Sequence, residues 1–178
     1  RSLLDLTDRF RGEGIHKVDA KGRVSIPALF RRVLESGDPD WTEGLNPNAV
    51  MVYGGITQKY LEVYTQNAIN EVDEKISYLS RGSKERRALE HIFNGQSLPT
   101  QPDESGRLVI PQRLREKVGI TNEAHFFATG DTFQIWSPES SNEKVKSIES
   151  WLTEQGDDFD PLVLLNPGTA KDIKEKMD

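Results

Sequence analysis

Short apolar runs, each bounded by turn residues, recur along the chain and predict strands. Two of them occupy residues 24–26 and 108–110, and each ends at a proline. Residues 124–129 and 132–136 flank a Gly-Asp pair, which predicts a hairpin. We therefore expect several short strands that are joined by tight turns.

Apolar residues at helical spacing alternate with these strands. A short helix is predicted after Pro27 and after Pro111, because apolar residues that follow each proline share one helix face. Longer helices are predicted at residues 65–80, at residues 83–94 and from Ser137 onward. Each longer helix has an apolar stripe that needs a surface to cover.

One segment of the chain occurs twice. Residues 19–34 align with residues 103–118 without a gap, at an offset of 84, and six of the sixteen positions are identical. The similarity continues downstream, since residues 49–55 resemble residues 124–130. The chain is therefore predicted to hold two copies of one unit, each built as strand, turn, strand, short helix, hairpin and longer helix.

A unit of about 60 to 70 residues with four short strands buries little apolar surface alone, so the two copies are expected to pair. The predicted fold class is α+β, with two tandem hairpin-and-helix repeats that form a pseudo-dimeric β-barrel within one chain, and with flanking helices. The expected parts are an N-terminal extension at 1–9, a first repeat at 10–80, a connecting helix at 81–95, a second repeat at 96–155 and an acidic C-terminal extension at 156–178.

Both copies contain a turn in which Asp is followed by Gly three residues later and by Arg four residues later. The residues are Asp19, Gly22 and Arg23 in the first copy and Asp103, Gly106 and Arg107 in the second. An Asp side chain can accept hydrogen bonds from the backbone of its own turn, and Gly tolerates positive φ. Each Asp is expected to cap the turn and orient its Arg; the alternative is a structural Asp–Arg pair that binds no ligand.

Charge is distributed unevenly along the chain. The whole sequence holds 23 Lys and Arg against 29 Asp and Glu, a net charge of −6. Between Phe10 and Arg32, however, six cations stand against two acids, whereas residues 137–178 hold five lysines and ten acids. The N-terminal region can therefore present a basic surface that the net charge conceals.

Several kinds of chemistry are excluded by composition. The chain has no cysteine, and its histidines, His16, His91 and His125, lack metal-ligand spacing. No nucleophile or metal cluster accompanies the acidic residues, so we expect no catalytic residue, no metal and no cofactor. The longest apolar run has five residues, against the roughly 18 of a membrane-spanning helix, and we expect a cytoplasmic protein.

The motifs resemble a known family. Phe10-Arg11-Gly12, followed by D-A-K-G-R-V-S-I-P at residues 19–27 and D-E-S-G-R-L-V-I-P at residues 103–111, is similar to the MraZ family of bacterial transcriptional regulators. The resemblance covers roughly residues 10–151, and its diagnostic feature is the doubled D-x-x-x-R motif. Swapped-hairpin regulators of the AbrB and MazE type share the single motif, so the resemblance implies two tandem AbrB-like repeats.

The resemblance also implies a function. It implies a repressor that binds double-stranded DNA as a homo-oligomer, in a closed ring, on direct repeats in the promoter of the division and cell-wall gene cluster. Such a protein would lie on the nucleoid and would use neither a membrane nor a small-molecule substrate. The residues implied to contact DNA are Arg23, Arg107, Lys21, Arg11 and Lys17, while Asp19, Asp103, Gly22 and Gly106 shape and orient the motif.

A second function class remains open. The chain can instead be an AbrB-like or antitoxin-type module whose acidic tail binds a protein partner. Residues 159–165 are apolar enough to dock on another surface, and they lie within the acidic extension.

Overall fold

The structure is a computed structural model that describes residues 8–166. The chain divides into two compact units, residues 1–141 and residues 142–178, and each is described by itself. The expected extensions at 1–9 and 156–178 lie largely outside the described residues. None of the helices found between residues 8 and 166 is long and apolar enough to cross a membrane.

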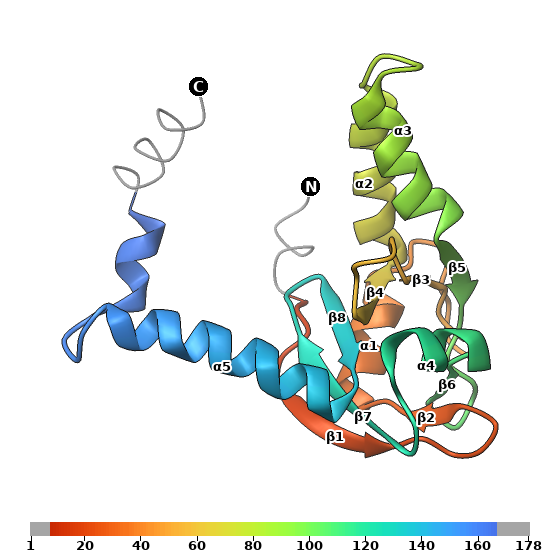
Figure 1. The fold of residues 1–178 in the computed structure, drawn as a ribbon. Coiled ribbons are helices and arrows are strands. Elements are labelled where there is room, and N and C mark those ends of the chain that lie inside the picture. Colours follow the sequence, from red (N-terminus) through yellow and green to blue (C-terminus); the bar gives the residue numbers. More distant parts are fainter. Residues whose placement is uncertain (1–7, 167–178) are drawn as a thin grey trace. The chain divides into compact units, whose positions relative to one another are not determined.

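The first unit combines antiparallel strands with short helices (Figure 1). Its strands are β1 (Glu13–Lys17), β2 (Arg23–Ser25), β3 (Ala49–Val52), β4 (Tyr60–Thr65), β5 (Ser97–Thr100), β6 (Arg107–Val109), β7 (Glu123–Ala128) and β8 (Thr132–Trp136). Its helices are α1 (Ala28–Ser36), α2 (Gln66–Ser77), α3 (Lys84–Glu90) with a π-helical turn at His91–Gly95, α4 (Gln112–Val118) and the start of α5 (Pro138–Glu154). The predicted α+β class is confirmed.

Strand pairing interleaves the two sequence copies. Six strands form one sheet in the order β1-β7-β8-β4-β3-β5, and β2 pairs with β6 in a separate ribbon. The strand before each turn thus pairs with the other copy, β1 with β7 and β5 with β3. Equivalent positions face each other where Val24 opposes Leu108 and where Glu62 opposes Gln134. This arrangement confirms the pseudo-dimer within one chain.

The tight turn predicted at residues 19–23 forms, but the strands on either side of it pair mainly with the other copy. The turn itself forms, since the Gly22 N–H donates to the Asp19 carbonyl at 2.9 Å. Next to the turn, Val18 and Val24 form an isolated bridge, and the Asp19 N–H donates to the Arg23 carbonyl at 3.1 Å. Among the described residues, β1 and β2 form no ladder with each other. Each strand continues its pairing in the other copy, which places the buried side chains of Val24 and Leu108 opposite each other across the ribbon.

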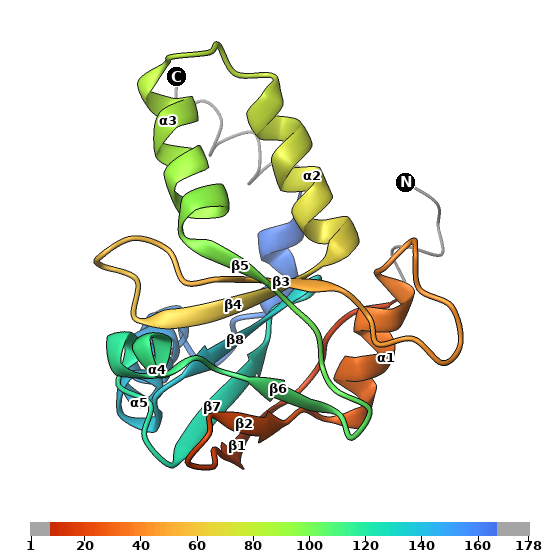
Figure 2. The same cartoon turned by 90° about the vertical axis from the view of Figure 1, so that its right-hand side faces the viewer.

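The hydrophobic core contains residues from the ribbon, the six-stranded sheet and the helices α1 and α4, which flank the strands in Figure 2. Phe133 lies at its centre, with ring centroids 5.0 Å from Phe10 and from Phe30 and 5.6 Å from Phe126. Val24 and Leu108 point from the ribbon into this core. Because side chains alternate along a strand, the residues on either side of them face outward.

The longer helices begin close to their predicted positions. The Thr65 side chain caps α2 by accepting from the Ala68 N–H at 3.0 Å, and the helix ends at Ser77, three residues before the predicted end. The connecting helix predicted at 83–94 is α3 together with its π-helical turn. These helices lie side by side and project away from the sheet (Figures 1 and 2).

Lys117 connects α4 of the second copy to the loop between β3 and β4 of the first. Its Nζ donates to the carbonyl oxygens of Tyr53, Gly55 and Gln58 at 2.8, 3.1 and 2.8 Å. One ammonium group therefore satisfies three acceptors in a loop that carries no regular pairing of its own.

Replacing Lys117 by Met should lower the free energy of unfolding by about 1–2 kcal/mol, because the carbonyl groups lose a charged donor. Urea unfolding measures this change. Lys59→Met is the matched control, since Lys59 is exposed in the same loop. Equal losses in the two variants would show that the three hydrogen bonds contribute nothing to stability.

Within residues 142–166, the second unit consists of the remainder of α5 and a 3-10 helix at Pro161–Leu165. Trp151 and Phe159 meet edge to face, with ring centroids 6.3 Å apart. Large apolar side chains stay exposed here, among them Ile148, Leu162 and Leu165 at 50%, 69% and 76%. Of the apolar stripe that the sequence predicts on α5, Ile148 is exposed, whereas Val145 and Leu152 are half-buried.

Candidate functional site

Each Asp-to-Arg turn is held by the same set of hydrogen bonds. In the first copy, Asp19 Oδ1 accepts from the backbone N–H groups of Lys21 and Arg23 at 3.0 and 2.8 Å, and Asp19 Oδ2 accepts from Arg23 Nε at 2.6 Å. Within residues 8–166, the terminal nitrogens of Arg23 make no hydrogen bond. The carboxylate therefore fixes the guanidinium by one edge and leaves its outer edge available.

The second turn repeats this geometry. Asp103 Oδ1 accepts from the backbone N–H groups of Ser105 and Arg107 at 2.9 and 3.0 Å, and Asp103 Oδ2 accepts from Arg107 Nε at 3.1 Å. The side chains of Arg23 and Arg107 are 37% and 38% exposed. Two equivalent arginines are thus oriented by equivalent carboxylates, and both remain accessible.

These contacts favour the charged form of each carboxylate. The backbone N–H of Arg23, helped by its side chain, lowers the pKa of Asp19 below the ordinary value of 3.8. The backbone N–H of Arg107, helped by the Ser105 N–H, lowers the pKa of Asp103 in the same way. A lowered folded-state pKa contributes stability above about pH 4, and this contribution is lost as the pH falls through the folded-state pKa.

Asp19→Asn should therefore destabilise the protein at pH 7 and have a diminishing effect as the pH is lowered toward 3. The amide has nearly the shape of the protonated carboxyl, so the variant and the wild type converge once Asp19 is protonated. Chemical unfolding of both proteins across this pH range measures the difference. A destabilisation that is independent of pH would contradict the charged role of Asp19.

The swapped ribbon brings the two arginines to one place. Arg23 and Arg107 lie on the adjacent strands β2 and β6, on the face opposite the buried Val24 and Leu108. Both arginines line one hollow of about 430 Å³ together with Lys17. The other lining residues include Ser25, Asn122 and the acidic Asp19 and Glu123. Three cations from both copies therefore converge on one surface of the first unit.

The structure separates the other two predicted contacts from this hollow. Lys21 is exposed in the first turn, where the second copy has Ser105. Arg11 lines a different hollow, beside Arg9 and Arg32 and next to α1. The sequence places all five cations in two short segments, but only three of them meet in space.

Some lining residues were not predicted from the sequence. Asn122 and Glu123 precede or begin β7, which pairs with β1, so the swapped pairing brings them beside Lys17. Val109 is 51% exposed on the outward face of the ribbon, next to the arginines. In strands of three residues, the sequence identifies the side chains that face outward only when the one that faces inward is already known.

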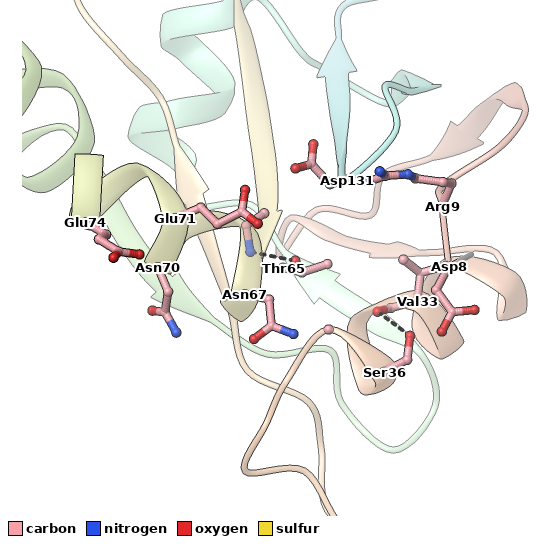
Figure 3. Close-up of a pocket in the computed structure, with 12 residues that line it drawn as sticks. Asp8, Arg9, Val33, Ser36, Thr65, Asn67, Asn70, Glu71, Glu74 and Asp131 are labelled. Carbon is pink, nitrogen blue, oxygen red and sulfur yellow. Dashed lines mark hydrogen bonds between the residues drawn. The ribbon is translucent and has the colours of Figure 1, made fainter. Parts of the chain in front are cut away.

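A larger hollow of about 610 Å³ has the opposite charge character (Figure 3). Asp8, Glu71, Glu74 and Asp131 line it together with the single cation Arg9. Four carboxylates against one guanidinium repel a phosphate backbone. This hollow is therefore unsuited to nucleic acid.

A Ser–His–Glu arrangement near β7 has a structural role. His125 Nδ1 lies 2.8 Å from Ser141 Oγ, and His125 Nε2 lies 3.4 Å from a Glu13 carboxylate oxygen. Ser141 is fully buried, and its hydroxyl donates to the Pro138 carbonyl at 2.9 Å. A nucleophile needs access to its substrate, which Ser141 lacks. Among residues 8–166, no group of three or more His, Cys, Asp or Glu could hold a metal.

The chain is similar to proteins of one known family. The family model described as "MraZ protein, putative antitoxin-like" matches residues 95–151. The chain is 57% identical over 159 residues to the Transcriptional regulator MraZ of Ruegeria pomeroyi, an alignment that covers 89% of this chain and 95% of the relative. The protein of the same name from Ruegeria sp. strain TM1040 is 59% identical over the same shares of both chains. That of Cereibacter sphaeroides strain ATCC 17025 is 41% identical over 86% of this chain and 95% of the relative.

These relatives define a transcriptional regulator, a class without enzymatic activity. The chain belongs to the MraZ family.

Proposed function

We propose that the protein binds double-stranded DNA through the outward face of the β2–β6 ribbon and its two turns. The observation that carries this proposal is the convergence of Arg23 and Arg107, one from each copy, on a single hollow that Lys17 also lines. The basic N-terminal region and the motif of the second copy therefore share one surface. This surface is rich in cations although the net charge of the chain is negative.

The ribbon has two paired strands, and such a ribbon can enter a DNA groove. The major groove of B-DNA admits a two-stranded β-ribbon, and an arginine fork can bind guanine O6 and N7 or a phosphate through two donors. The outward edges of Arg23 and Arg107 provide such donors, and the exposed Val109 provides an apolar contact for a thymine methyl group. Lys17 and Lys21 are positioned to neutralise phosphates, with Arg11 as an outlying contact.

Asp19 and Asp103 take a different role in this proposal. A carboxylate repels phosphate, so neither Asp contacts the DNA backbone. Each Asp instead stabilises its turn and orients its arginine. Gly22 and Gly106 allow the turn, with φ of +82° and +74°. The four residues thus shape the motif, and the cations contact the DNA.

Affinity is expected to come from several copies of this surface. One cluster of a few cations binds DNA weakly, at about 10⁻⁴ to 10⁻⁶ M at physiological salt. A homo-oligomer, arranged as a closed ring, presents several ribbons to direct repeats, and avidity can then add about 10² to 10⁴. In this proposal the protein is a cytoplasmic repressor on the nucleoid and binds the promoter of the division and cell-wall gene cluster.

The test is a titration of the full chain against a fluorescent duplex from the region upstream of its own gene, beside a scrambled duplex of equal length. Binding should prefer the upstream duplex, and log K should fall linearly with log salt. Duplexes with one repeat should bind about 10² to 10⁴ times more weakly than duplexes with all repeats. Equal affinity for both duplexes, or full affinity from a monomer measured by analytical ultracentrifugation, would contradict the proposal.

A second candidate function is the binding of a protein partner through the acidic tail. The exposed apolar side chains of the second unit, including Leu162 and Leu165, favour it, since they follow the acidic Asp157 and Asp158 closely in the sequence. Native mass spectrometry of the protein from its own cells tests it. A stoichiometric small basic protein would support this function, and a spectrum of homo-oligomers alone would count against it.

A further inference from the structure

The two helices that follow the turns each carry an arginine that no function above has used. Arg31 on α1 and Arg115 on α4 are equivalent positions, since they are separated by the repeat offset of 84. They form one of the six identities between the copies, and both are half-buried. An arginine retained at the same position of both copies, beneath the surface, calls for a structural or positioning explanation.

Arg31 reaches across to the turn of the second copy. Its Nη1 donates to the Asp103 carbonyl at 2.5 Å, and its Nη2 donates to Asn46 Oδ1 at 3.0 Å. The Glu35 carboxylate lies 3.7 Å from its Nε. The Asp103 carbonyl also accepts the Gly106 N–H at 2.9 Å, which closes the turn. Arg31 therefore holds the same carbonyl that closes the turn before Arg107.

Arg115 approaches the turn of the first copy, at a carbonyl one residue later than the equivalent of the one that Arg31 contacts. Its Nη1 lies 3.5 Å from the Ala20 carbonyl. Its guanidinium also packs over Gly22, where an added Cβ would lie 3.1 Å from Arg115 Cζ and Nε. The Nε of Arg115 is buried and has no hydrogen-bond partner in the described part of the chain, so this arginine is held less tightly than Arg31.

Backbone hydrogen bonds also connect each turn to the other copy. The Ile26 N–H donates to the Gly106 carbonyl at 2.9 Å, and the Ile110 N–H donates to the Gly22 carbonyl at 2.8 Å. Each turn is therefore attached, by backbone and by one arginine, to the segment that begins the helix of the other copy.

We propose that Arg31 and Arg115 are cross-copy positioning residues, each of which holds the Asp-to-Arg turn of the other copy so that Arg23 and Arg107 keep a fixed separation. In so far as the turns contact DNA, this inference rests on the proposed function. The two turns then behave as one rigid surface, which lowers the ordering cost of binding. Arg31 and Arg115 touch no DNA themselves.

Amide hydrogen exchange of the full chain tests the crossed relation, because exchange reports local opening. In Arg31→Ala, the amides of residues 104–107 should exchange faster while those of residues 20–23 are unchanged. In Arg115→Ala, the pattern should reverse, with a smaller increase because its contact is longer. Arg32→Ala, an exposed neighbour on α1, is the control and should change neither turn. Faster exchange in the arginine's own copy, or no change in either turn, would overturn the proposal.

DNA affinity and conservative variants provide the second measurement. Arg31→Ala should weaken binding to the upstream duplex by about tenfold, since the lost donor is charged, and Arg31→Lys should recover part of the loss. Should an alanine variant fail to fold, Arg31→Lys and Arg115→Lys still test the crossed exchange pattern. If the wild type binds no DNA, the proposed function fails while the exchange pattern still decides the cross-copy contact. The crossed pattern with unchanged DNA affinity would overturn the positioning role.

Discussion

The double variant Arg23→Ala plus Arg107→Ala is expected to lose at least roughly 30-fold in affinity for the upstream duplex. A well-placed bidentate arginine contributes about 1–3 kcal/mol, and each 1.4 kcal/mol is a factor of ten. The loss should be larger where several ribbons bind at once, because avidity multiplies it. Fluorescence titration across a salt series measures both the affinity and the salt dependence.

The control for this variant is Arg32→Ala plus Arg113→Ala, which removes the same charge from other surfaces. Arg32 lines the hollow next to α1, and the Arg113 guanidinium lies 5.1 Å from the centre of the Tyr53 ring. General electrostatic attraction weakens with net charge, so both double variants should lose some non-specific binding. Only the ribbon variant should lose the preference for the upstream sequence. Equal losses in both would mean that the D-x-x-x-R turns serve the fold alone.

Gly22→Ala is expected to destabilise the protein by about 2–4 kcal/mol, because positive φ and a backbone clash add together. Gly22 has φ of +82°, and a Cβ there would lie 2.3 Å from the Ile110 carbonyl oxygen. That carbonyl belongs to the other copy, so the backbone of the swapped ribbon must shift to admit a methyl group. Urea unfolding measures the loss.

Gly106→Ala is the matched control, since it occupies the equivalent position in the second turn. Its φ is +74°, and nothing lies within 4 Å of the added Cβ. Only the conformational cost remains, about 1–2 kcal/mol. Similar losses at the two positions, or a larger loss at Gly106, would contradict the close approach of the first turn to Ile110.

Much of the local structure follows from the sequence. The repeat at an offset of 84 correctly predicts two equivalent sets of elements, and the hairpin at residues 124–136 forms as β7 and β8. Ser137 caps α5 as predicted, with its Oγ accepting from the Ser140 N–H at 3.1 Å. Turns, helix caps and hairpins are determined mainly by residues close together in the sequence, and for this reason a sequence pattern predicts them.

The exchange of strands between copies does not follow from the local pattern of residues, and only the resemblance to swapped-hairpin regulators implies it. The residues on each side of the Asp19 turn suit a local hairpin, and nothing in them specifies β7 as the partner of β1 or β6 as the partner of β2. The choice depends on burying Val24 against Leu108 and on closing one core from both copies. Pairing across such sequence distances is decided by tertiary packing.

The candidate site was accessible to sequence reasoning in part. The motif identified Arg23 and Arg107, but their convergence on one hollow depends on the swap. Arg11 lies elsewhere, since the chain between it and the turn runs the length of β1. The identity of Arg31 and Arg115 was visible in the repeat; their reach into the opposite copy was not.

Hydrogen-exchange mass spectrometry of the full chain, with and without the upstream duplex, tests the central claim most directly. Protection on binding DNA is expected at residues 17–25 and 103–109, which are the two turns and the ribbon. A scrambled duplex at the same concentration should give less protection there. Protection confined to α2 and α3, or to the acidic hollow of Figure 3, would contradict the assignment of the ribbon as the DNA-binding surface.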